Sequence, residues 1–402
     1  MKIGIIKEGK IPIDRRVAFS PEACVHLQNT FSQLQFKIQP SPIRCFPDQA
    51  YQAAGLPISE DLSDCDVLFG IKEVPIIDLI PHKTYFFFSH TIKKQSYNRE
   101  LLRRLLSNQV QMIDYECLTN LRGQRLVAFG RFAGIVGAYN TIRAYGLRQG
   151  LFDLKPAYQC DDMAMMQQEY QKLALGPIKI ILTGRGRAGQ GAREVLKAMG
   201  IVEVSAQEIL EQSFVHPVFS QLKSRDYYQP KEAKEGAALD FYQEPEAFKS
   251  DFLKYAQVSD VFISAHYWNP KASALFQLSE IKRPDFRIKV IGDITCDVQG
   301  SIPSTLRVST VKAPFYDYDP HKEKEARAFS DPGNITVMAV DNLPTELPRD
   351  ASLDFGQQLG EVVIPRLLGV DEEAVLERAT ISQGGRLMPN YAYLRDFVES
   401  PA

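Results

Sequence analysis

The chain has 402 residues, of which 45% are hydrophobic and 24% are charged, as is usual for a globular protein. The formal net charge is −2, so no basic field exists to bind a nucleic acid or an anionic membrane surface, and we expect neither partner. No apolar run reaches the ~18 residues of a membrane span, and the start, MKIGIIKEGK, lacks the apolar core of a signal peptide. The scattered cysteines show no metal-binding spacing, which predicts reduced, mostly buried thiols in a cytoplasmic protein.

The first roughly 130 residues alternate strand-like and helix-like runs. Strands are predicted for KIGIIK, FKIQP, DVLFGIK, TYFFFSH and QMIDYE, and helices for PEACVHLQNTFSQL and YNRELLRRLLSNQ. The run from Tyr85 to Phe88 is continuously apolar, which is typical of a parallel strand covered on both faces. This alternation indicates a mostly parallel sheet with helices on its faces.

A second strand and helix pattern follows Gly134. GIVGAYNTIRAYGLRQ predicts a helix whose small residues pack closely, and IKIILTG, VEVS, SDVFISAHYW and IKVIGDIT predict strands. The polar, Tyr-rich stretch from about Ser213 to Ser250 is interpreted as surface loops and short helices. Near the end, ITVMAVDNLPTELPRDAS predicts one more strand and FGQQLGEVVIPRLL a helix that returns to the first domain. The predicted fold class is therefore α/β, with two Rossmann-like domains, parallel sheets and a discontinuous first domain.

A glycine-rich loop lies between a predicted strand and a predicted helix. In LTGRGRAGQGAREVLKAMG, Gly184, Gly186 and Gly189 have the Gly-x-Gly-x-x-Gly spacing. The first glycine permits a tight turn, the second lets a pyrophosphate approach the backbone, and the third lets the helix pack on the strand. We interpret the loop as a dinucleotide-binding loop, with a plain tight turn as the alternative.

The choice between NAD and NADP stays open from the sequence. The second strand, VEVS, ends at Ser205, where an acidic residue that holds the ribose hydroxyls of NAD is expected. A neutral residue there removes the repulsion of a 2′-phosphate, and Arg185 and Arg187 lie in the glycine loop. The alternative for both arginines is that they are solvated loop charges.

Polar side chains follow several predicted strands of the first domain, where ligands of open α/β sheets bind. They are Arg15 and Arg16, Lys72 and Glu73, His90 and Lys93, and Asp114 and Glu116. A substrate with carboxylates and a reacting amine needs such a set, because arginine binds carboxylates bidentately while lysine and histidine exchange protons.

Each of these residues also has a structural interpretation. His90 could be a hydrogen-bonded structural histidine, Arg16 could simply pair with Asp14, and Lys72 with Glu73 could form a charged turn. In the second domain, Asp293 and Asp297 could cap a loop without contacting a ligand.

Several longer strings resemble a known family. KTYFFFSHTIKKQ, MIDYECL, RGQRLVAFGRFAG, VIGDITCDVQGSI and AVDNLPTELPRDAS are similar, in order and spacing, to the lysine–2-oxoglutarate reductase domain of the bifunctional aminoadipic semialdehyde synthases. They resemble more distantly the lysine-forming saccharopine dehydrogenases and alanine dehydrogenase. The resemblance covers nearly the whole chain.

The resemblance implies a two-domain oxidoreductase with its active site in the cleft between the domains. Residues 1–138 and 340–402 would form a substrate domain like the N-terminal domain of alanine dehydrogenase, and 139–339 a dinucleotide-binding Rossmann domain. The implied reaction condenses the ε-amine of L-lysine with 2-oxoglutarate and reduces the imine with NAD(P)H to saccharopine, reversibly. The partners are then small molecules, an amino acid and a 2-oxo acid, and homo-oligomerisation is left open.

The resemblance also implies roles for individual residues. The acid/base pair falls on Lys72 of GIKEVP and His90 of FSHTIK, and the R-x-A-x-[ST]-P motif makes Arg16 a substrate carboxylate ligand. The positions implied to line the substrate cleft are Lys93, Glu116 and Arg131, and those implied to bind NAD or NADP are Gly184, Gly186, Arg187, Gly189, Ser205 and Asp297.

Some features depart from the bifunctional enzymes. The sequence KEVP matches the saccharopine and alanine dehydrogenase branches, the glycine loop differs in its intervening residues, and the second catalytic domain has no counterpart in this sequence. One alternative is therefore an alanine or other amino-acid dehydrogenase, and another is a non-catalytic dinucleotide-binding regulatory protein. The extra lysine in SHTIKKQ favours the larger substrate, and the presence of both Lys72 and His90 argues against the regulatory protein.

Overall fold

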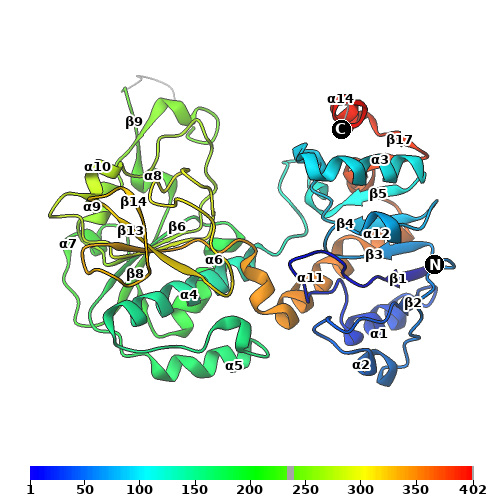
Figure 1. Ribbon diagram of the computed structural model, residues 1–402, viewed down its shortest axis with the longest axis horizontal. Coiled ribbons are helices and arrows are strands. Elements are labelled where there is room, and N and C mark those ends of the chain that lie inside the picture. Colours follow the sequence, from blue (N-terminus) through cyan, green and yellow to red (C-terminus); the bar gives the residue numbers. More distant parts are fainter. Residues whose placement is uncertain (233–239, 401–402) are drawn as a thin grey trace. The chain divides into compact units, whose positions relative to one another are not determined.

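The computed structural model describes residues 1–232 and 240–400, which form two compact units. Unit 1 comprises Met1–Phe129 and Pro348–Ala402, and unit 2 comprises Gly130–Leu347. In Figure 1, unit 1 is blue to cyan and orange to red, whereas unit 2 is mainly green to yellow. The boundary expected at 138/139 falls inside a continuous helix, Gly130–Gln149, so the units divide before this helix and not within it.

Unit 1 contains one sheet with helices around it. Its elements are β1 (Lys2–Ile5), α1 (Pro21–Thr30), β2 (Gln35–Ile38), α2 (Asp48–Ala53), β3 (Val67–Phe69), β4 (Thr84–Phe87), α3 (Arg99–Ser107), β5 (Gln111–Asp114), α11 (Pro348–Val362), α12 (Ile364–Leu368), α13 (Val375–Ala379), β16 (Thr380–Gln383), β17 (Arg386–Leu387) and α14 (Arg395–Glu399). The strand order is β17-β16-β5-β4-β3-β1-β2. The strands β2, β1, β3, β4 and β5 run parallel, and β16 and β17 add an antiparallel edge.

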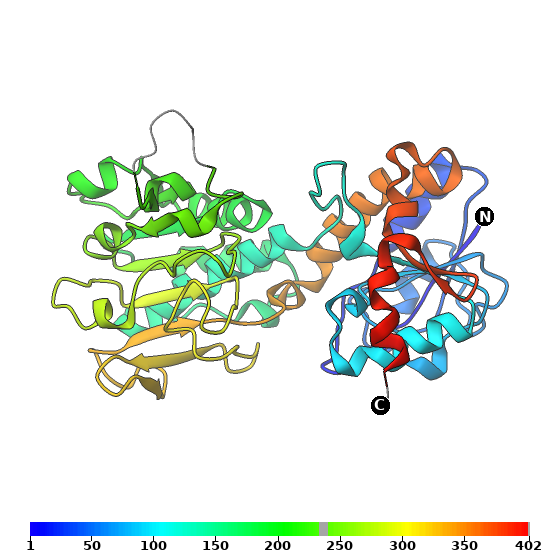
Figure 2. The ribbon, with the colours of Figure 1, turned by 90° about the horizontal axis from the view of Figure 1, so that it is seen from above.

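Of the predicted run Tyr85 to Phe88, the first three residues belong to β4, which lies between β3 and β5, and are buried, whereas Phe88 follows the strand and is half-buried. Phe69 of β3 and Phe86 of β4 are paired in register and stack with ring centroids 4.6 Å apart. The C-terminal segment joins this unit through pairing of β16 with β5, and Figures 1 and 2 show its orange and red elements beside the blue and cyan ones. The core of unit 1 is therefore built from both ends of the chain.

Unit 2 has a Rossmann-like sheet. Its elements are α4 (Gly130–Gln149), α5 (Met163–Gln168), β6 (Lys179–Thr183), α6 (Arg187–Ala198), β7 (Val202–Glu203), α7 (Glu208–Glu211), β8 (Val218–Leu222), α8 (Ser224–Tyr227), β9 (Tyr228–Pro230), β10 (Phe248–Ser250), α9 (Leu253–Ala256), β11 (Val261–Ser264), α10 (Leu278–Ile281), β12 (Val290–Asp293), β13 (Phe315–Asp319), β14 (Lys324–Ala326) and β15 (Ile335–Met338). The main strand order is β14-β13-β15-β12-β11-β6-β8-β7, parallel from β15 to β7, with β13 and β14 antiparallel. The predicted α/β fold class with two mostly parallel sheets is confirmed.

The prediction of surface loops and short helices between Ser213 and Ser250 is wrong for β8. This strand is mostly buried and pairs in parallel with β6 on one side and β7 on the other. Val218 and Leu222 enter the hydrophobic core, which explains why a stretch flanked by polar residues forms an inner strand. The part of the predicted insertion at 233–239 lies outside the described residues.

Helices α4 and α6 pack closely because of glycines at their contact. A Cβ on Gly134 would overlap the backbone of Ala188, and one on Gly191 would overlap that of Arg131. The expectation that the small residues of this helix pack closely is therefore confirmed.

Two further expectations concern membranes and thiols. In 1–232 and 240–400, no helix combines the length and apolarity needed to cross a membrane. The cysteines are all free in the part of the chain that the structure describes, and Cys24, Cys45, Cys65 and Cys160 are buried.

Candidate active site

The carboxyl edge of the unit 1 sheet carries the predicted polar residues. Because Ile5, Phe69, Phe86 and Ile113 lie level in adjacent parallel strands, the loops that follow start at the same edge. These loops carry Glu8 and Lys10 after β1, Lys72 and Glu73 after β3, His90 and Lys93 after β4, and Glu116 after β5. The structure thus brings the predicted Lys72, His90, Lys93 and Glu116 to one edge.

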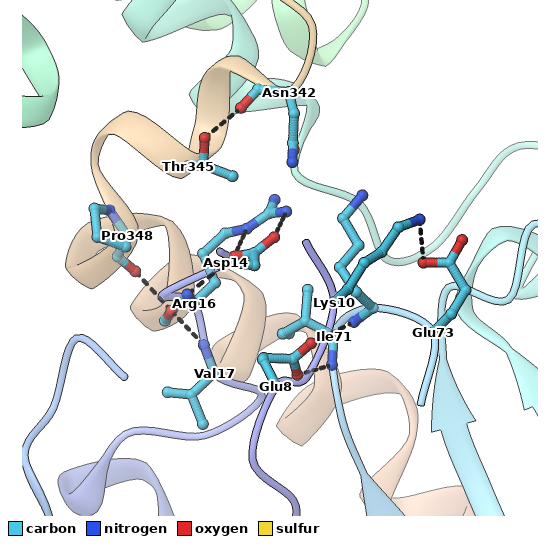
Figure 3. Close-up of polar contacts among 12 residues, drawn as sticks. Glu8, Lys10, Asp14, Arg16, Val17, Ile71, Glu73, Asn342, Thr345 and Pro348 are labelled. Atoms are coloured by element: carbon cyan, nitrogen blue, oxygen red, sulfur yellow. Dashed lines mark hydrogen bonds and ion pairs between the residues drawn. The ribbon is translucent and has the colours of Figure 1, made fainter. Parts of the chain in front are cut away.

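Glu73, in the loop after β3, contacts a residue in the loop after β4 and another in the loop after β1. Its Oε1 lies 2.7 Å from Nδ1 of His90, and its Oε2 accepts from Nζ of Lys10 at 2.6 Å (Figure 3 shows the Lys10 contact). Burial opposes ionisation, but the hydrogen bonds from His90 and Lys10 outweigh it and lower the pKa of Glu73 to about 2. A carboxylate at Nδ1 favours the tautomer that carries the proton there, which leaves Nε2 of His90 as the basic nitrogen.

The backbone of His90 has positive dihedral angles. With φ 52° and ψ 13°, it lies in the left-handed region, where few residues other than glycine are found. Buried Asp114 holds the preceding turn by accepting hydrogen bonds from the backbone amides of Ser89 and Glu116 at 3.0 and 2.7 Å. Strained backbone conformations of this kind cluster at functional sites, so the conformation of His90 supports a functional role for this residue.

Lys72 lies beside Glu8, which we did not identify from the sequence. The carboxylate of Glu8 accepts hydrogen bonds from the backbone amides of Ile71 and Lys72 at 2.7 and 2.9 Å (Figure 3 shows the Ile71 contact). Burial, reinforced by the charge of Asp14, raises the pKa of Glu8 to about 8. Burial, followed by the positive charge of Arg16, lowers the pKa of Lys72. Two groups with pKa values shifted toward neutrality therefore sit at adjacent strand ends, as in sites of proton transfer.

Arg16 is tied to Asp14 by two hydrogen bonds. Its Nε donates to Oδ1 at 3.0 Å and its Nη2 to Oδ2 at 2.6 Å, and both residues are 2% exposed (Figure 3). The guanidinium carbon also lies 4.1 Å from the ring centroid of Phe129. The pairing with Asp14 that the sequence analysis considered is thus present, and Arg16 forms a buried ion pair in this unit.

Glu116, which follows β5, contacts two positively charged side chains. Its Oε1 contacts Nη2 of Arg125 and lies 3.3 Å from Nζ of Lys93. Burial opposes ionisation, but Arg125 and Lys93 outweigh it and lower the pKa of Glu116. Its buried Oε2 has no hydrogen-bond partner among the described residues, so one carboxylate oxygen remains available to a donor.

Arg131 belongs to unit 2. It lies on α4 and pairs with Glu194 of α6, Nε donating to Oε2 at 2.9 Å and Nη2 to Oε1 at 2.7 Å. Its predicted place in the substrate cleft stays a prediction, because Arg131 and the predicted residues of unit 1 belong to different units.

The glycine loop of unit 2 has the geometry that the motif predicts. Gly184 has φ +92°, and a Cβ there would overlap the backbone of Ala265. A Cβ on Gly189 would overlap the carbonyl of Gly184, whereas one on Gly186 would project into open space. The third glycine thus lets α6 approach β6, and the second leaves the backbone open to a ligand.

We expect Gly189→Ala and Gly186→Ala to behave differently. The first should lower the free energy of unfolding by about 1–3 kcal/mol, because the added methyl has no room against the Gly184 carbonyl. The second should unfold at the wild-type urea concentration but bind dinucleotide less tightly, since its methyl projects into open space beside the loop. Urea unfolding and calorimetric titration measure the two effects, and equal stability of both variants would contradict the packing role of Gly189.

A cavity of about 570 Å³ lies beside this loop. It is lined by Gly184, Arg185, Gly186, Leu222, Lys223, Ser224, Arg225, Tyr227, Phe241, Tyr242, Ala265, His266 and Tyr267. These residues come from the carboxyl ends of β6, β8 and β11, which end level with one another, and from the Phe241–Tyr242 segment. A cavity of this size suits a nucleotide, and the tyrosines at its rim offer aromatic faces to a base.

His266 is the most buried polar residue of this cavity. It is 7% exposed, and its Nδ1 lies 2.8 Å from Oγ1 of Thr183. Its buried Nε2 has no partner among the described residues, and burial lowers the pKa of the ring to about 4. A neutral imidazole nitrogen without a partner is a place for a hydrogen bond from a ligand.

Ser205, predicted to bind the cofactor, follows an edge strand of unit 2. Ser205 follows β7, which is the edge strand, and exchanges hydrogen bonds with Glu208 at 2.8 and 3.1 Å. The strand beside β6 is β8, and Lys223, Ser224 and Arg225, which follow its end, line the cavity. Arg187 and Asp297 are not among the described residues that line this cavity.

The sequence analysis missed Glu8, Lys10 and Arg125 in unit 1 and Lys223 and Arg225 in unit 2. Glu8 and Lys10 directly follow the first predicted strand, so the rule that located Lys72 and His90 also applies to them. Lys223 and Arg225 follow a strand that was itself not predicted, and no signal in the sequence placed them beside the glycine loop.

The first third of the chain matches the sequence model of a protein family. Residues 4–136 match the sequence model of the alanine dehydrogenase/PNT N-terminal domain. The chain is 29% identical over 437 residues to the alpha-aminoadipic semialdehyde synthase of Arabidopsis thaliana, covering 98% of this chain and 41% of that protein. It is 25% identical to the saccharopine dehydrogenase [NAD(+), L-lysine-forming] of Emericella nidulans, covering 91% of each. The chain thus spans less than half the length of the semialdehyde synthases that it matches.

Solved structures share the fold. An L-alanine dehydrogenase superposes with a TM-score of 0.65 at 16% identity over 99% of each chain. A transhydrogenase from Sinorhizobium meliloti gives 0.57 at 15% identity, covering 96% of this chain and 99% of the other. Residues 4–136 thus match an alanine dehydrogenase/PNT N-terminal domain, nearly the whole chain is similar in sequence to semialdehyde synthases and to lysine-forming saccharopine dehydrogenases, and the chain shares the fold of an L-alanine dehydrogenase.

Proposed function

We propose that this protein catalyses the reversible reductive condensation of L-lysine with 2-oxoglutarate to saccharopine, with NADH or NADPH as hydride donor. The observation that carries the proposal is the edge of the unit 1 sheet, where Lys72 follows β3, and His90, held by Glu73 at 2.7 Å, follows the adjacent strand β4. A reaction that passes through a carbinolamine and an imine needs groups of this kind to move protons near neutral pH.

The steps follow from the chemistry of the substrates. The ε-amine of lysine, once deprotonated, attacks the ketone carbon of 2-oxoglutarate, and the carbinolamine then loses water after its hydroxyl is protonated. We assign these proton transfers to Lys72 and to Nε2 of His90. A nicotinamide dinucleotide held at the glycine loop would supply the hydride that reduces the carbon of the imine, and the imine nitrogen, protonated before this step, would become the secondary amine of saccharopine.

The carboxylates and the second amine of the substrates need charged partners. Lys93 and Arg125 are half-exposed cations at the end of β5, where they could accept a carboxylate. The unpartnered Oε2 of Glu116 suits the α-ammonium group of an amino acid. Because the guanidinium of Arg16 is paired with Asp14, we assign Arg16 an electrostatic role. Its positive charge helps to lower the pKa of Lys72.

Unit 2 fits a nicotinamide dinucleotide. The open space above Gly186 accommodates a pyrophosphate, and the cavity beside it, with the unpartnered Nε2 of His266, accommodates the adenosine half. We therefore assign the dinucleotide to the glycine loop and this cavity.

Oxidation of NADH and of NADPH with 2-oxoglutarate, with and without L-lysine, tests the proposal. We expect oxidation that depends on both lysine and 2-oxoglutarate and yields saccharopine by mass spectrometry. Activity with ammonia and pyruvate alone would instead identify an alanine dehydrogenase. Dinucleotide binding without turnover of any amine and oxo acid would identify the regulatory protein, and either result would overturn the proposal.

A further inference from the structure

We propose that Gln358 of α11 is a positioning residue of the candidate active site, because it holds the backbone of Ala128 and thereby keeps the ring of Phe129 against the guanidinium of Arg16. Through Arg16 it acts on Lys72, to which we assign proton transfer. The inference rests on the proposed function, since it concerns the proton-transfer group of that same site. It gives the C-terminal segment of unit 1 a part in the chemistry of the N-terminal segment.

The side-chain amide of Gln358 bonds to both polar groups of one backbone residue. Its Oε1 accepts a hydrogen bond from the backbone amide of Ala128 at 2.9 Å, and its Nε2 donates to the carbonyl of Ala128 at 3.2 Å. A carboxamide suits this task because it carries an acceptor and a donor side by side. The two residues lie 230 positions apart, so the contact fixes the end of the N-terminal segment on α11.

Asp354, one turn earlier on α11, sets the orientation of this amide. Its Oδ2 accepts a hydrogen bond from Nε2 of Gln358 at 2.6 Å. An ionised carboxylate accepts hydrogen bonds and an amide oxygen cannot donate one, so the nitrogen of Gln358 faces Asp354 and its oxygen faces the amide of Ala128. This orientation is the one that both bonds to Ala128 require.

The same helix also holds the side chain that follows Ala128. The ring of Phe129 stacks on the ring of Phe355 of α11, with centroids 4.2 Å apart and an interplanar angle of 10°. Phe355 is fully buried and Phe129 is 9% exposed. The guanidinium carbon of Arg16 lies 4.1 Å from the centroid of the Phe129 ring, within the range in which a cation and an aromatic face attract each other. The contact between Phe129 and Arg16 therefore depends on α11.

Arg16 connects this contact with Lys72. Burial of Lys72, followed by the positive charge of Arg16, lowers the pKa of Lys72. If the Phe129 ring moves, Arg16 loses one of the groups that hold it and water reaches the packed side chains, so both causes weaken. The pKa of Lys72 should then rise. The other charged groups that act on Lys72 or bond to its backbone are Asp14, Glu73, Lys10 and Glu8.

The decisive experiment measures the rate at which acetic anhydride acetylates Lys72 in the full chain, as a function of pH. The deprotonated amine is the nucleophile, so the midpoint of this pH dependence reports the protonation of Lys72 and requires no turnover. Peptide mass spectrometry separates Lys72 from the other lysines.

Gln358→Met should move the midpoint to higher pH and lower the acetylation rate at pH 7 about 3- to 10-fold, the effect of moving one unit charge a few ångströms away. Phe129→Leu keeps the backbone bonds to Gln358 but removes the ring, and it should move the midpoint in the same direction. The double variant should move it no further than Phe129→Leu alone, because both changes act through one contact.

The matched control is Gln357→Met, the same change at an exposed neighbour on α11 whose side-chain amide bonds to Glu361. It should keep the wild-type midpoint. Thermal unfolding verifies that each variant folds, and Phe129→Leu provides the test if Gln358→Met does not. Turnover in the variants should approach that of the wild type at high pH, whereas a merely destabilised enzyme would lose turnover at every pH.

An unchanged midpoint in folded Gln358→Met or Phe129→Leu, or an equal shift in Gln357→Met, would overturn the inference and leave the proposed reaction intact. Failure of the wild type to form saccharopine would instead overturn the proposed function, and the acetylation series would still decide whether Gln358 positions Arg16.

Discussion

Replacing Lys72 with methionine should lower the turnover number about 100-fold or more while leaving dinucleotide affinity unchanged. Methionine keeps the length of the side chain but cannot carry a proton, and the glycine loop and its cavity belong to unit 2. Since burial lowers the pKa of Lys72, the wild-type rate should rise with pH through that lowered pKa, and the variant should lack this limb. Initial rates at saturating substrate, measured across a pH series, test both points.

The control for this variant is Lys83→Met, which removes a lysine just before β4, at the opposite edge of the same sheet. It should retain wild-type rates. His90→Gln should match Lys72→Met in its loss of turnover, because glutamine keeps a hydrogen bond to Glu73 but supplies no base. Near-normal rates in either variant would remove that residue from the proton-transfer pair.

Stability provides a second readout for Lys72. A lysine whose pKa is lower in the folded protein than in the unfolded chain destabilises the fold while the unfolded chain carries the proton. This penalty is fully present below the lowered pKa and disappears as the pH rises through the unfolded value of about 10.4. Lys72→Met should therefore be at least as stable as the wild type at neutral pH, so a loss of turnover cannot be attributed to unfolding.

Replacing Arg16 with alanine should lower the free energy of unfolding by about 3–5 kcal/mol, because it leaves the carboxylate of Asp14 buried without its partner. Burial opposes ionisation of Asp14, but Arg16 outweighs it and lowers its pKa, so this carboxylate stabilises the fold at neutral pH and ceases to do so as the pH falls through the lowered pKa. The free energy of unfolding should therefore depend differently on pH in the variant at acidic pH. Urea unfolding at several pH values measures both effects.

Arg15→Ala is the matched control, since Arg15 is exposed and adjacent, and its loss should change the free energy of unfolding by less than about 0.5 kcal/mol. The double variant Asp14→Leu with Arg16→Met should be more stable than Arg16→Ala, because two apolar side chains leave no buried charge unpaired. A stable Arg16→Ala protein with a raised KM for 2-oxoglutarate would show instead that Arg16 serves the substrate alone.

Patterns that are local in the sequence predicted their structures well. The apolar run at Tyr85–Phe87 forms an inner strand, and Gly184 and Gly189 occupy the tight positions that their spacing requires. The residues of unit 1 that follow strands also came together, because the ends of parallel strands meet at one edge. Each of these predictions depends on residues that are close to one another in the sequence, such as a strand and the loop that follows it.

The features that could not be predicted depend on contacts between distant segments. Val218–Leu222 looks like part of a polar insertion, and only its pairing with β6 shows that it is an inner strand. The second strand along the chain, β7, is the edge strand in space, so the order of strands in the sequence does not tell which strand lies beside β6. The ion pair of Arg131 with Glu194 joins two helices, and no spacing rule connects the two residues.

The split of unit 1 into two chain segments has a consequence for biosynthesis. Unit 2 is contiguous, so it can complete its sheet as soon as β15 has emerged from the ribosome, whereas β5 remains an unpaired sheet edge until Thr380–Gln383 are made. An exposed edge strand invites pairing with other chains. The edge of β5 therefore stays unpaired throughout the synthesis of unit 2. Chaperone binding at this stage should protect the nascent chain most from aggregation through this edge.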